Sequence, residues 1–304
     1  MKLLAILSCI LWGSAFAGAK IGFEYMPPIL LSGMRFTLAG VLLFPLIIGK
    51  KLDVVSTIKH NWKFMMKFSF VQTFLQYGMF FLALNEVPGA VAAIINGAGP
   101  LFIAILAHFA MPDDKITPQK LFSIILGLAG VVFISAANGI AADIGNIAFF
   151  LGVIFLIVSM IIAGYTNIMV AKYKEKLSPI VLTSFANFTG GIALFIFGLF
   201  VEELPMAKLP IEFYAAWLWL AIIPAAGFTM WYTLLQRPGV KVSDLNMWKF
   251  IIPVTGCLLS WLLLPGESPN TASILCIIII ATSLQLYQYP IKLKRNKNKT
   301  PIND

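Results

Sequence analysis

The chain alternates long apolar stretches with short polar breaks along nearly its whole length. A helix that spans a bilayer needs about 20 mainly apolar residues. Ten stretches meet this requirement, and the breaks between them carry the Pro, Gly, Asn and charged residues that are typical of turns. The predicted spans are residues 3–21, 28–48, 64–84, 89–110, 120–137, 146–170, 179–200, 213–235, 244–264 and 272–291. The pattern predicts an all-α integral membrane protein with ten transmembrane helices.

Composition agrees with a surface that faces lipid. Of the 304 residues, 60% are hydrophobic and only 12% are charged, whereas a soluble domain carries about 25% charged residues. The N-terminus imitates a signal peptide, because Lys2 precedes an apolar stretch and the small-residue pattern of residues 15–17. The apolar run continues to Ile21, however, so we expect a retained first helix.

The basic residues are distributed unevenly over the breaks. If the N-terminus is cytoplasmic, 18 of the 22 Lys and Arg residues lie on the cytoplasmic side, and the outer loops hold only Lys20 and Lys208. Such an asymmetry favours both termini in the cytoplasm, and we expect a multi-pass protein of the inner (plasma) membrane. Because orientation accounts for the net charge of +9, we expect no nucleic-acid partner.

The two halves of the chain resemble each other. Residues 90–100 align with residues 243–253, and Asp114 then falls opposite Glu267. Five spans is an odd number, so the second half must enter the membrane inverted relative to the first, as in many secondary transporters. The predicted organisation is a first five-helix repeat at 1–139, a second at 140–293, and a basic cytoplasmic tail at 294–304.

Short motifs of small and apolar residues recur in both halves. They lie at residues 11–16, 27–36, 88–93, 99–102, 126–132, 227–232, 252–254 and 265–267. In order and spacing they resemble the EamA-type drug/metabolite transporters over essentially the whole chain. The resemblance implies ten helices in two inverted five-helix repeats, and export or exchange of metabolites such as amino acids. Residues 112–114 depart from the pattern, since they read Pro-Asp-Asp where the family often has Gly-Glu.

Two cations inside predicted spans are candidates for function, because a Lys or Arg at a helix centre costs about 2.5–3.5 kcal/mol on insertion scales. Lys249 lies near the start of the ninth span and aligns with Asn96 of the first half. Its ammonium could reach the interface or line a cavity and attract a carboxylate. Arg35 could extend outward to the interface, form a structural or gating ion pair with a carboxylate such as Glu24 or Glu86, or contact substrate.

Polar and aromatic side chains add to this set. Gln72 and Gln76 share one helical face, with Tyr77 beside them, and they could bond neighbouring helices or line a cavity. Aromatic walls with a few polar groups suit a small-molecule pocket. The predicted substrate-binding residues are Trp12, Arg35, Gln72, Gln76, Tyr77, Asn96, Trp231, Tyr232, Trp248 and Lys249.

These features predict a secondary transporter that moves small metabolites, amino acids or related compounds, by efflux or exchange through alternating access. One alternative is a multidrug or cationic-compound exporter, which would need an acidic cavity residue. A membrane-embedded enzyme is more distant, because the sequence has no P-loop, GxSxG elbow or metal-binding spacing. We expect no catalytic residue, metal or cofactor. The expected partners are the bilayer and a small-molecule substrate, and a homodimer stays open beside a monomer.

Overall fold

The fold is a bundle of helices, seen in a computed structural model that describes residues 2–141, 147–173, 177–205 and 208–288; within these residues there is no strand. The predicted tail at 294–304 lies outside them. In chain order the elements are α1 (Lys2–Phe23), α2 (Pro28–Leu42), α3 (Phe44–Gly49), α4 (Val54–Ser69), the π-helix η1 (Phe70–Gln76), α5 (Tyr77–Glu86), α6 (Gly89–Asn96), α7 (Gly99–Ala110), α8 (Pro118–Ala141), α9 (Ile147–Lys172), α10 (Pro179–Val201), α11 (Ile211–Leu235), α12 (Val242–Asn246), the 3₁₀-helix η2 (Met247–Phe250), α13 (Ile251–Leu263) and α14 (Thr271–Gln288).

Seven helical segments of the described chain are long and apolar enough to cross a membrane. Two shorter apolar helices lie at Pro118–Ile134 and Thr271–Tyr287. Large apolar side chains also cover the outside, for example Phe109, Phe200 and Leu262 at 80%, 84% and 77% exposure. Lipid solvates such side chains and water does not. The structure is therefore consistent with the predicted all-α membrane protein.

One segment differs from the sequence-based prediction. Residues 49–63 fall between the predicted spans 28–48 and 64–84, but α4 begins at Val54, and the Asp53 carboxylate accepts the N–H of Ser56 at 3.0 Å as an N-cap. Met65 and Phe68 are buried, whereas the lysines of α4 are exposed. This amphipathic spacing stabilises a helix at the bundle surface, although its lysines lowered the apolar count on which the span prediction rested.

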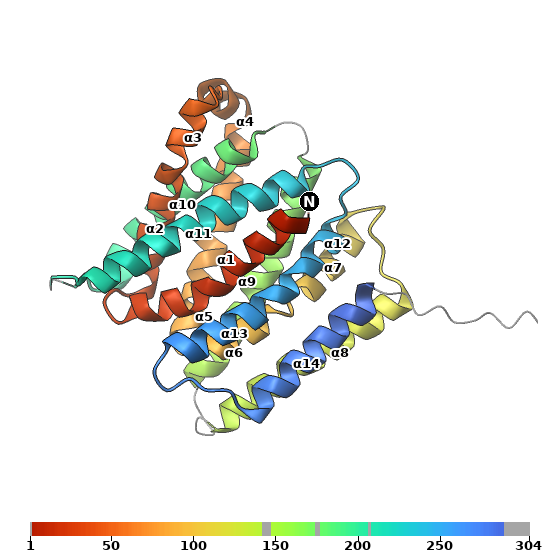
Figure 1. Ribbon diagram of the computed structural model, residues 1–304. Coiled ribbons are helices and arrows are strands. Elements are labelled where there is room, and N and C mark those ends of the chain that lie inside the picture. Colours follow the sequence, from red (N-terminus) through yellow and green to blue (C-terminus); the bar gives the residue numbers. More distant parts are fainter. Residues whose placement is uncertain (1, 142–146, 174–176, 206–207, 289–304) are drawn as a thin grey trace, which may run out of the picture.

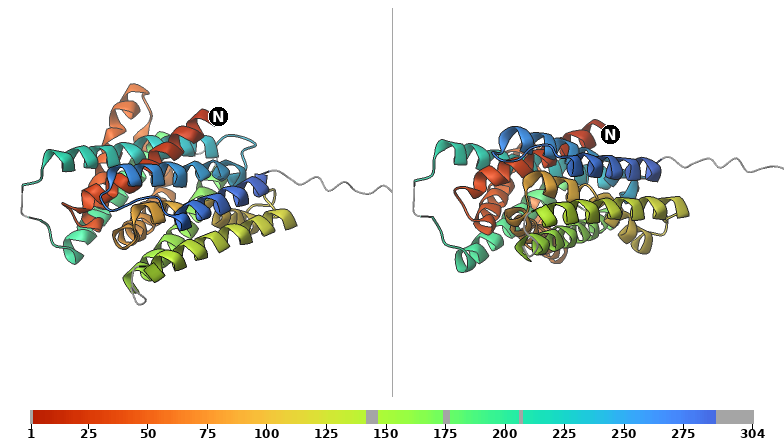
Figure 2. Two further views of the ribbon diagram at one scale, coloured as in Figure 1. Left: turned by 60° about the horizontal axis from the view of Figure 1, so that its bottom comes forward. Right: turned by 90° about the horizontal axis from the view of Figure 1, so that it is seen from below.

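The helices of the two halves are interleaved. α1 packs against α11 and α13, and α9 packs against α5 and α7. α2 lies along α10 and α6 along α13, while α8 and α14 form a pair along one side of the bundle (Figures 1 and 2). The ends of α1 and α13 lie at one end of the bundle, and the start of α1 and the α11–α12 loop lie at the other (Figure 1). Each half therefore makes its most extensive contacts with the other half.

Glycines bring α2 and α10 into backbone contact. A Cβ added at Gly33 would overlap the backbone of Phe195, and one added at Gly191 would overlap the backbone of Thr37. An added Cβ at Gly40 would likewise overlap Phe188, and one at Gly198 would overlap Leu30. Residue numbers in these contacts increase along α2 while they decrease along α10, so the two helices run antiparallel. Small residues at such a crossing let apolar helices approach closely, which is a main source of packing energy in lipid.

Carboxylates from loops of one half cap helices of the other. The backbone N–H groups of Gly89 and Ala90 donate to the Glu267 carboxylate at 2.6 and 2.8 Å. The N–H of Ser243 donates to Asp114 at 3.0 Å, and the Ser243 hydroxyl donates to the same carboxylate. A negative charge at a helix N-terminus satisfies unpaired N–H groups and complements the helix dipole. Because Ala90 aligns with Ser243 and Asp114 with Glu267, exchanging the halves maps one cap onto the other.

Removing the charge of one such cap should weaken the fold measurably. Glu267→Gln keeps one acceptor oxygen but turns an amide NH₂ toward a helix N-terminus, so we expect the free energy of unfolding to fall by about 1–2 kcal/mol. Thermal unfolding of the purified protein in micelles measures the loss. Glu203→Gln is the matched control, since Glu203 is exposed. Equal midpoints for the two variants would contradict a stabilising cap.

Candidate functional site

A cavity of about 90 Å³ lies among α1, α2, α5, α9, α11 and the two interrupted helices α6–α7 and α12–α13. One buried water needs a cavity of only about 10–15 Å³, so this cavity is larger than a simple packing defect. Side chains from both halves of the chain line it. Eight of the ten predicted substrate-binding residues are among them: Trp12, Arg35, Gln76, Tyr77, Asn96, Trp231, Tyr232 and Lys249.

Two helix interruptions meet at this cavity. α6 ends at Asn96, and α7 begins at Gly99 after a turn. In the second half, the 3₁₀-helix η2 carries Lys249 between α12 and α13. The interruptions touch, because a Cβ added at Gly97 would lie 2.7 Å from Cγ of Pro253. Discontinuous helices at corresponding positions of two halves typically mark the binding site of a transporter.

The Lys249 ammonium lies against two indole rings. Its Nζ is 5.3 Å from the ring centroid of Trp12 and 5.1 Å from that of Trp231. The two indoles meet edge to face at 5.0 Å, and Nε1 of Trp231 donates to Oδ1 of Asn167 at 2.8 Å. Each ring contact stabilises a cation by about 0.5–2 kcal/mol. Lys249 therefore points into the cavity, and the interpretation that its ammonium reaches the interface finds no support in this geometry.

Arg35 is the second cation on the cavity wall. It is only 2% exposed, and its guanidinium lies 4.3 Å from the ring centroids of Phe36 and Phe81. Its Nε has no hydrogen-bond partner. The predicted ion pair with Glu24 or Glu86 is not formed, because among the described residues no carboxylate reaches ion-pair distance of Arg35. Aromatic faces thus hold this charge inside the bundle.

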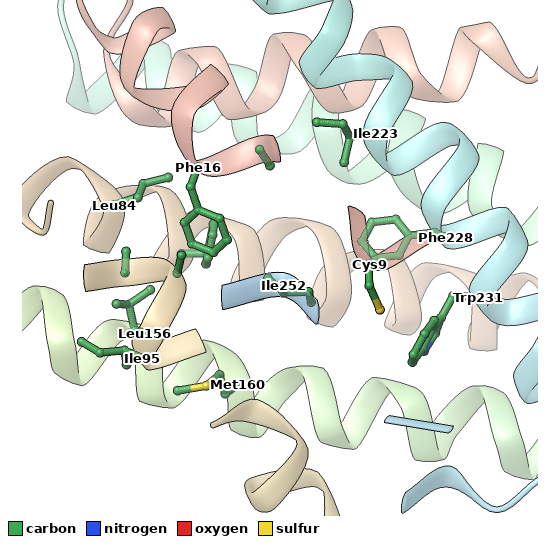
Figure 3. Packing of buried hydrophobic residues seen from close by; sticks show 14 of the residues in the cluster. Cys9, Phe16, Leu84, Ile95, Leu156, Met160, Ile223, Phe228, Trp231 and Ile252 are labelled. Carbon is green, nitrogen blue, oxygen red and sulfur yellow. The ribbon is translucent and has the colours of Figure 1, made fainter. Parts of the chain in front are cut away.

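Aromatic rings continue the wall between these cations. Phe228 stacks on Tyr232 with ring centroids 5.5 Å apart, and it lies 5.5 Å from Trp12 and 5.8 Å from Tyr77. Figure 3 shows Phe228 and Trp231, which belong with Cys9 of α1 to one cluster of buried residues. A glycine makes room for this packing, since a Cβ at Gly227 would lie 2.9 Å from Nε1 of Trp12. The cavity therefore offers an aromatic, apolar surface beside each charge.

Two predicted residues lie outside the cavity lining. Gln72 is buried, and its Oε1 accepts the Thr73 hydroxyl at 2.7 Å. The prediction placed Gln72 and Gln76 on one face of an α-helix, but residues 70–76 form the π-helix η1. A π-helix has a wider turn, so α-helical spacing does not hold across it. Trp248 lies partly buried against the apolar core instead.

Three polar residues on α9 line the cavity and were missed by the sequence analysis: Ser159, Thr166 and Asn167. Asn167 holds the Trp231 indole and donates to the carbonyl of Ala163 at 2.6 Å. The signal was present, because an isolated Asn within a 26-residue apolar helix needs a partner in lipid. Apolar length alone predicts this helix and says nothing of which polar positions on it face a cavity.

Acidic side chains are missing from the described cavity wall. No Asp or Glu is among the lining residues, whereas Arg35 and Lys249 are. Within the described parts of the chain, no group of three or more His, Cys, Asp or Glu side chains could hold a metal ion. The described wall can therefore contact a ligand through two cations, neutral polar groups and aromatic faces.

Comparisons with known proteins agree with this architecture. The transporter YvbV of Bacillus subtilis (strain 168) is 25% identical over 96% of this chain and 92% of its own length. A protein of Escherichia coli (strain K12) named "Probable amino-acid metabolite efflux pump" is 22% identical over 96% of both chains. A solved crystal structure shares the fold, with a TM-score of 0.73 and 20% identity over 94% of this chain and 96% of that chain.

The family comparison covers nearly the whole chain. The EamA-like transporter family matches residues 1–136 and again residues 150–287. The resemblance inferred from the sequence motifs is thereby confirmed. With its apolar helices and its efflux-pump relatives, this match makes the protein a multi-pass membrane protein of a transporter class. The chain belongs to the EamA-like transporter family.

Proposed function

We propose that the protein is a secondary transporter of small metabolites that works by alternating access between two inverted five-helix repeats. The observation that carries the proposal is a cavity at two touching helix interruptions, one from each half, with Asn96 and Lys249 at aligned positions. Two rigid halves that share such a cavity can rock about it and open it to each side in turn.

Three features support the inverted repeat and the predicted domains at 1–139 and 140–293. The helix contacts of α1 reappear in α9 when the halves are exchanged. The reciprocal caps of Glu267 and Asp114 obey the same exchange. The family matches the chain twice, once in each half. Five spans per half would make ten, with α4, η1 and α5 forming the third.

The proposed cargo is a small amphipathic metabolite, an amino acid or a related compound, moved by efflux or exchange. The name of the Escherichia coli relative points to this class. A carboxylate would meet Lys249, and an apolar body would lie on the aromatic wall. An exporter of cations is disfavoured, since the described cavity wall carries two cations and no carboxylate.

Transport by exchange is tested with the purified protein in liposomes. Vesicles preloaded with an unlabelled metabolite should accumulate the same labelled metabolite from outside, with and without a proton gradient. Exchange that is saturable and absent from protein-free vesicles supports the proposal. Metabolite entry that stays linear with concentration and does not depend on preloading indicates a channel instead.

The proposed orientation in the inner membrane places both termini in the cytoplasm and predicts an all-or-none labelling pattern. The three native cysteines are buried and are first replaced by Ala. In intact cells, a membrane-impermeant maleimide should then label Lys208→Cys and Ser268→Cys, because both positions follow outward-ending helices. It should label Lys172→Cys and Lys241→Cys only after permeabilisation. Labelling of Lys172→Cys and Ser268→Cys from the same side contradicts the alternation of spans.

A further inference from the structure

We propose that the cavity selects organic acids of net negative charge, with an apolar or aromatic body, over zwitterions and cations of the same shape. This inference rests on the proposed function only in taking the ligand of the cavity to be the cargo. It narrows the proposed cargo to the related organic acids and away from zwitterionic amino acids, the class that the name of the Escherichia coli relative suggests.

The charges on the wall carry the first step. Arg35 and Lys249 both line the cavity, and no Asp or Glu of the described chain joins them there. No hydrogen bond or ion pair from a described residue reaches the Lys249 ammonium, and Nε of Arg35 is buried without a partner. Two cations that line the cavity without counter-charges, Arg35 almost fully buried and Lys249 partly so, favour an anion strongly. A bound carboxylate would supply the missing negative charge.

The neutral polar groups carry the second step. Ser159 and Thr166 already donate their hydroxyls to backbone carbonyls of α9, at 2.7 and 3.0 Å, and the Asn167 amide is engaged on both sides. A ligand ammonium would find only neutral oxygens and ring faces, and Arg35 and Lys249, two like charges, already lie against these rings. A zwitterion therefore gains at its carboxylate and loses at its ammonium, whereas an organic acid only gains.

The aromatic wall carries the third step. Arg35 lies 5.3 Å from the ring centroid of Tyr77. The Tyr77 ring contacts Phe228, and Phe228 contacts Trp12. Trp12 in turn lies against the Lys249 ammonium. An unbroken row of rings thus connects the two cations. An apolar body can lie along this row while a carboxylate at its end contacts Lys249, which is how a few polar groups orient a ligand in an apolar pocket.

Three probes that share a phenylethyl body separate these possibilities: 3-phenylpropionate, phenylalanine and phenethylamine. Binding is measured by isothermal titration calorimetry on the purified full chain in micelles at neutral pH. We expect 3-phenylpropionate to bind at least tenfold more tightly than phenylalanine, and phenethylamine to show no saturable binding. The proposal is overturned if phenylalanine binds as tightly as 3-phenylpropionate. It is also overturned if phenethylamine binds saturably or if 3-phenylpropionate does not bind.

Variants link the preference to the two cations. Lys249→Met should lower the affinity for 3-phenylpropionate at least tenfold. Lys249→Arg should retain this affinity within a few fold, because it keeps the charge. Lys172→Met is the control, since Lys172 is exposed at the end of α9. Arg35→Gln should reduce the difference in affinity between 3-phenylpropionate and phenylalanine. If Lys249→Met and Lys172→Met bind the acid equally, the assignment of Lys249 fails.

Failure of this proposal and failure of the transport function are distinguishable. If the acid binds with the expected order but no preloaded exchange occurs in liposomes, the anion site stands and transport is overturned. If exchange occurs but zwitterions or cations are preferred, transport stands and the anion site is overturned.

Discussion

Replacement of Lys249 by Met is expected to remove nearly all transport while leaving the protein folded. Methionine has a similar length and keeps the apolar contact with Trp12 and Trp231, so packing should survive. What disappears is the charge that would meet the carboxylate of the cargo. Losing one partner of a buried charge pair costs about 2–5 kcal/mol, and 1.4 kcal/mol is tenfold. We therefore expect the exchange rate in liposomes, at low substrate, to fall about 30-fold or more.

Two controls separate this effect from misfolding. Lys172→Met removes an exposed positive charge at the end of α9 and should exchange at the parental rate. Lys249→Arg keeps the charge beside the indoles and should retain part of the activity. The thermal midpoint of Lys249→Met should match or exceed that of the parent, because an uncompensated, partly buried cation has been removed. Undiminished exchange by Lys249→Met would remove this lysine from the binding site.

A bulky side chain at Gly191 is expected to prevent assembly of the bundle. A Cβ at this position already overlaps the backbone of Thr37 on α2, and a backbone cannot turn aside as a side chain can. Gly191→Leu should therefore fail to yield a monodisperse protein. The milder Gly191→Ala should lower the free energy of unfolding by about 1–3 kcal/mol, the usual cost of overpacking.

The matched controls lie at Gly49, the last residue of α3, where an added Cβ meets nothing within 4 Å. Gly49→Leu should accumulate like the parent, and Gly49→Ala should unfold at the parental midpoint. Size-exclusion chromatography and thermal unfolding in the same detergent measure both series. A Gly191→Leu protein that elutes and unfolds like Gly49→Leu would show that the α2–α10 crossing tolerates separation.

Helix positions could be predicted where composition alone decides them. α9 and α10 coincide closely with predicted spans, because long apolar runs have no other favourable place than lipid. Local detail could not be predicted where a helix depends on its neighbours. α4 begins before the predicted third span, and the ninth span, long and apolar enough to cross a membrane over Val242–Leu263, is interrupted by η2 between α12 and α13. Burial of one face against the bundle and interruption at a cavity are not visible in an apolar count.

The candidate site shows the same division. Lys249 and Asn96 could be paired from the repeat, because aligned halves place aligned residues at one pseudo-symmetric centre. The sequence could not exclude Gln72 from the cavity lining, since the wider turn of a π-helix changes the direction in which its side chains point. Asn167 became visible only through its bond to Trp231, and the rings around Arg35 only through the packing of α2 against α5.

The sequence by itself determined that the protein has an apolar, lipid-compatible surface, belongs to a transporter family and contains two related halves, because apolar length, motif order and internal alignment are properties of the linear chain. Only the tertiary structure decided that Arg35 lies among rings without an acidic partner, that both helix interruptions meet, and that the cavity between them carries two cations and, along its described wall, no acid. Contacts between residues far apart in the chain decide these features, since the environment of a charge depends on which helices surround it.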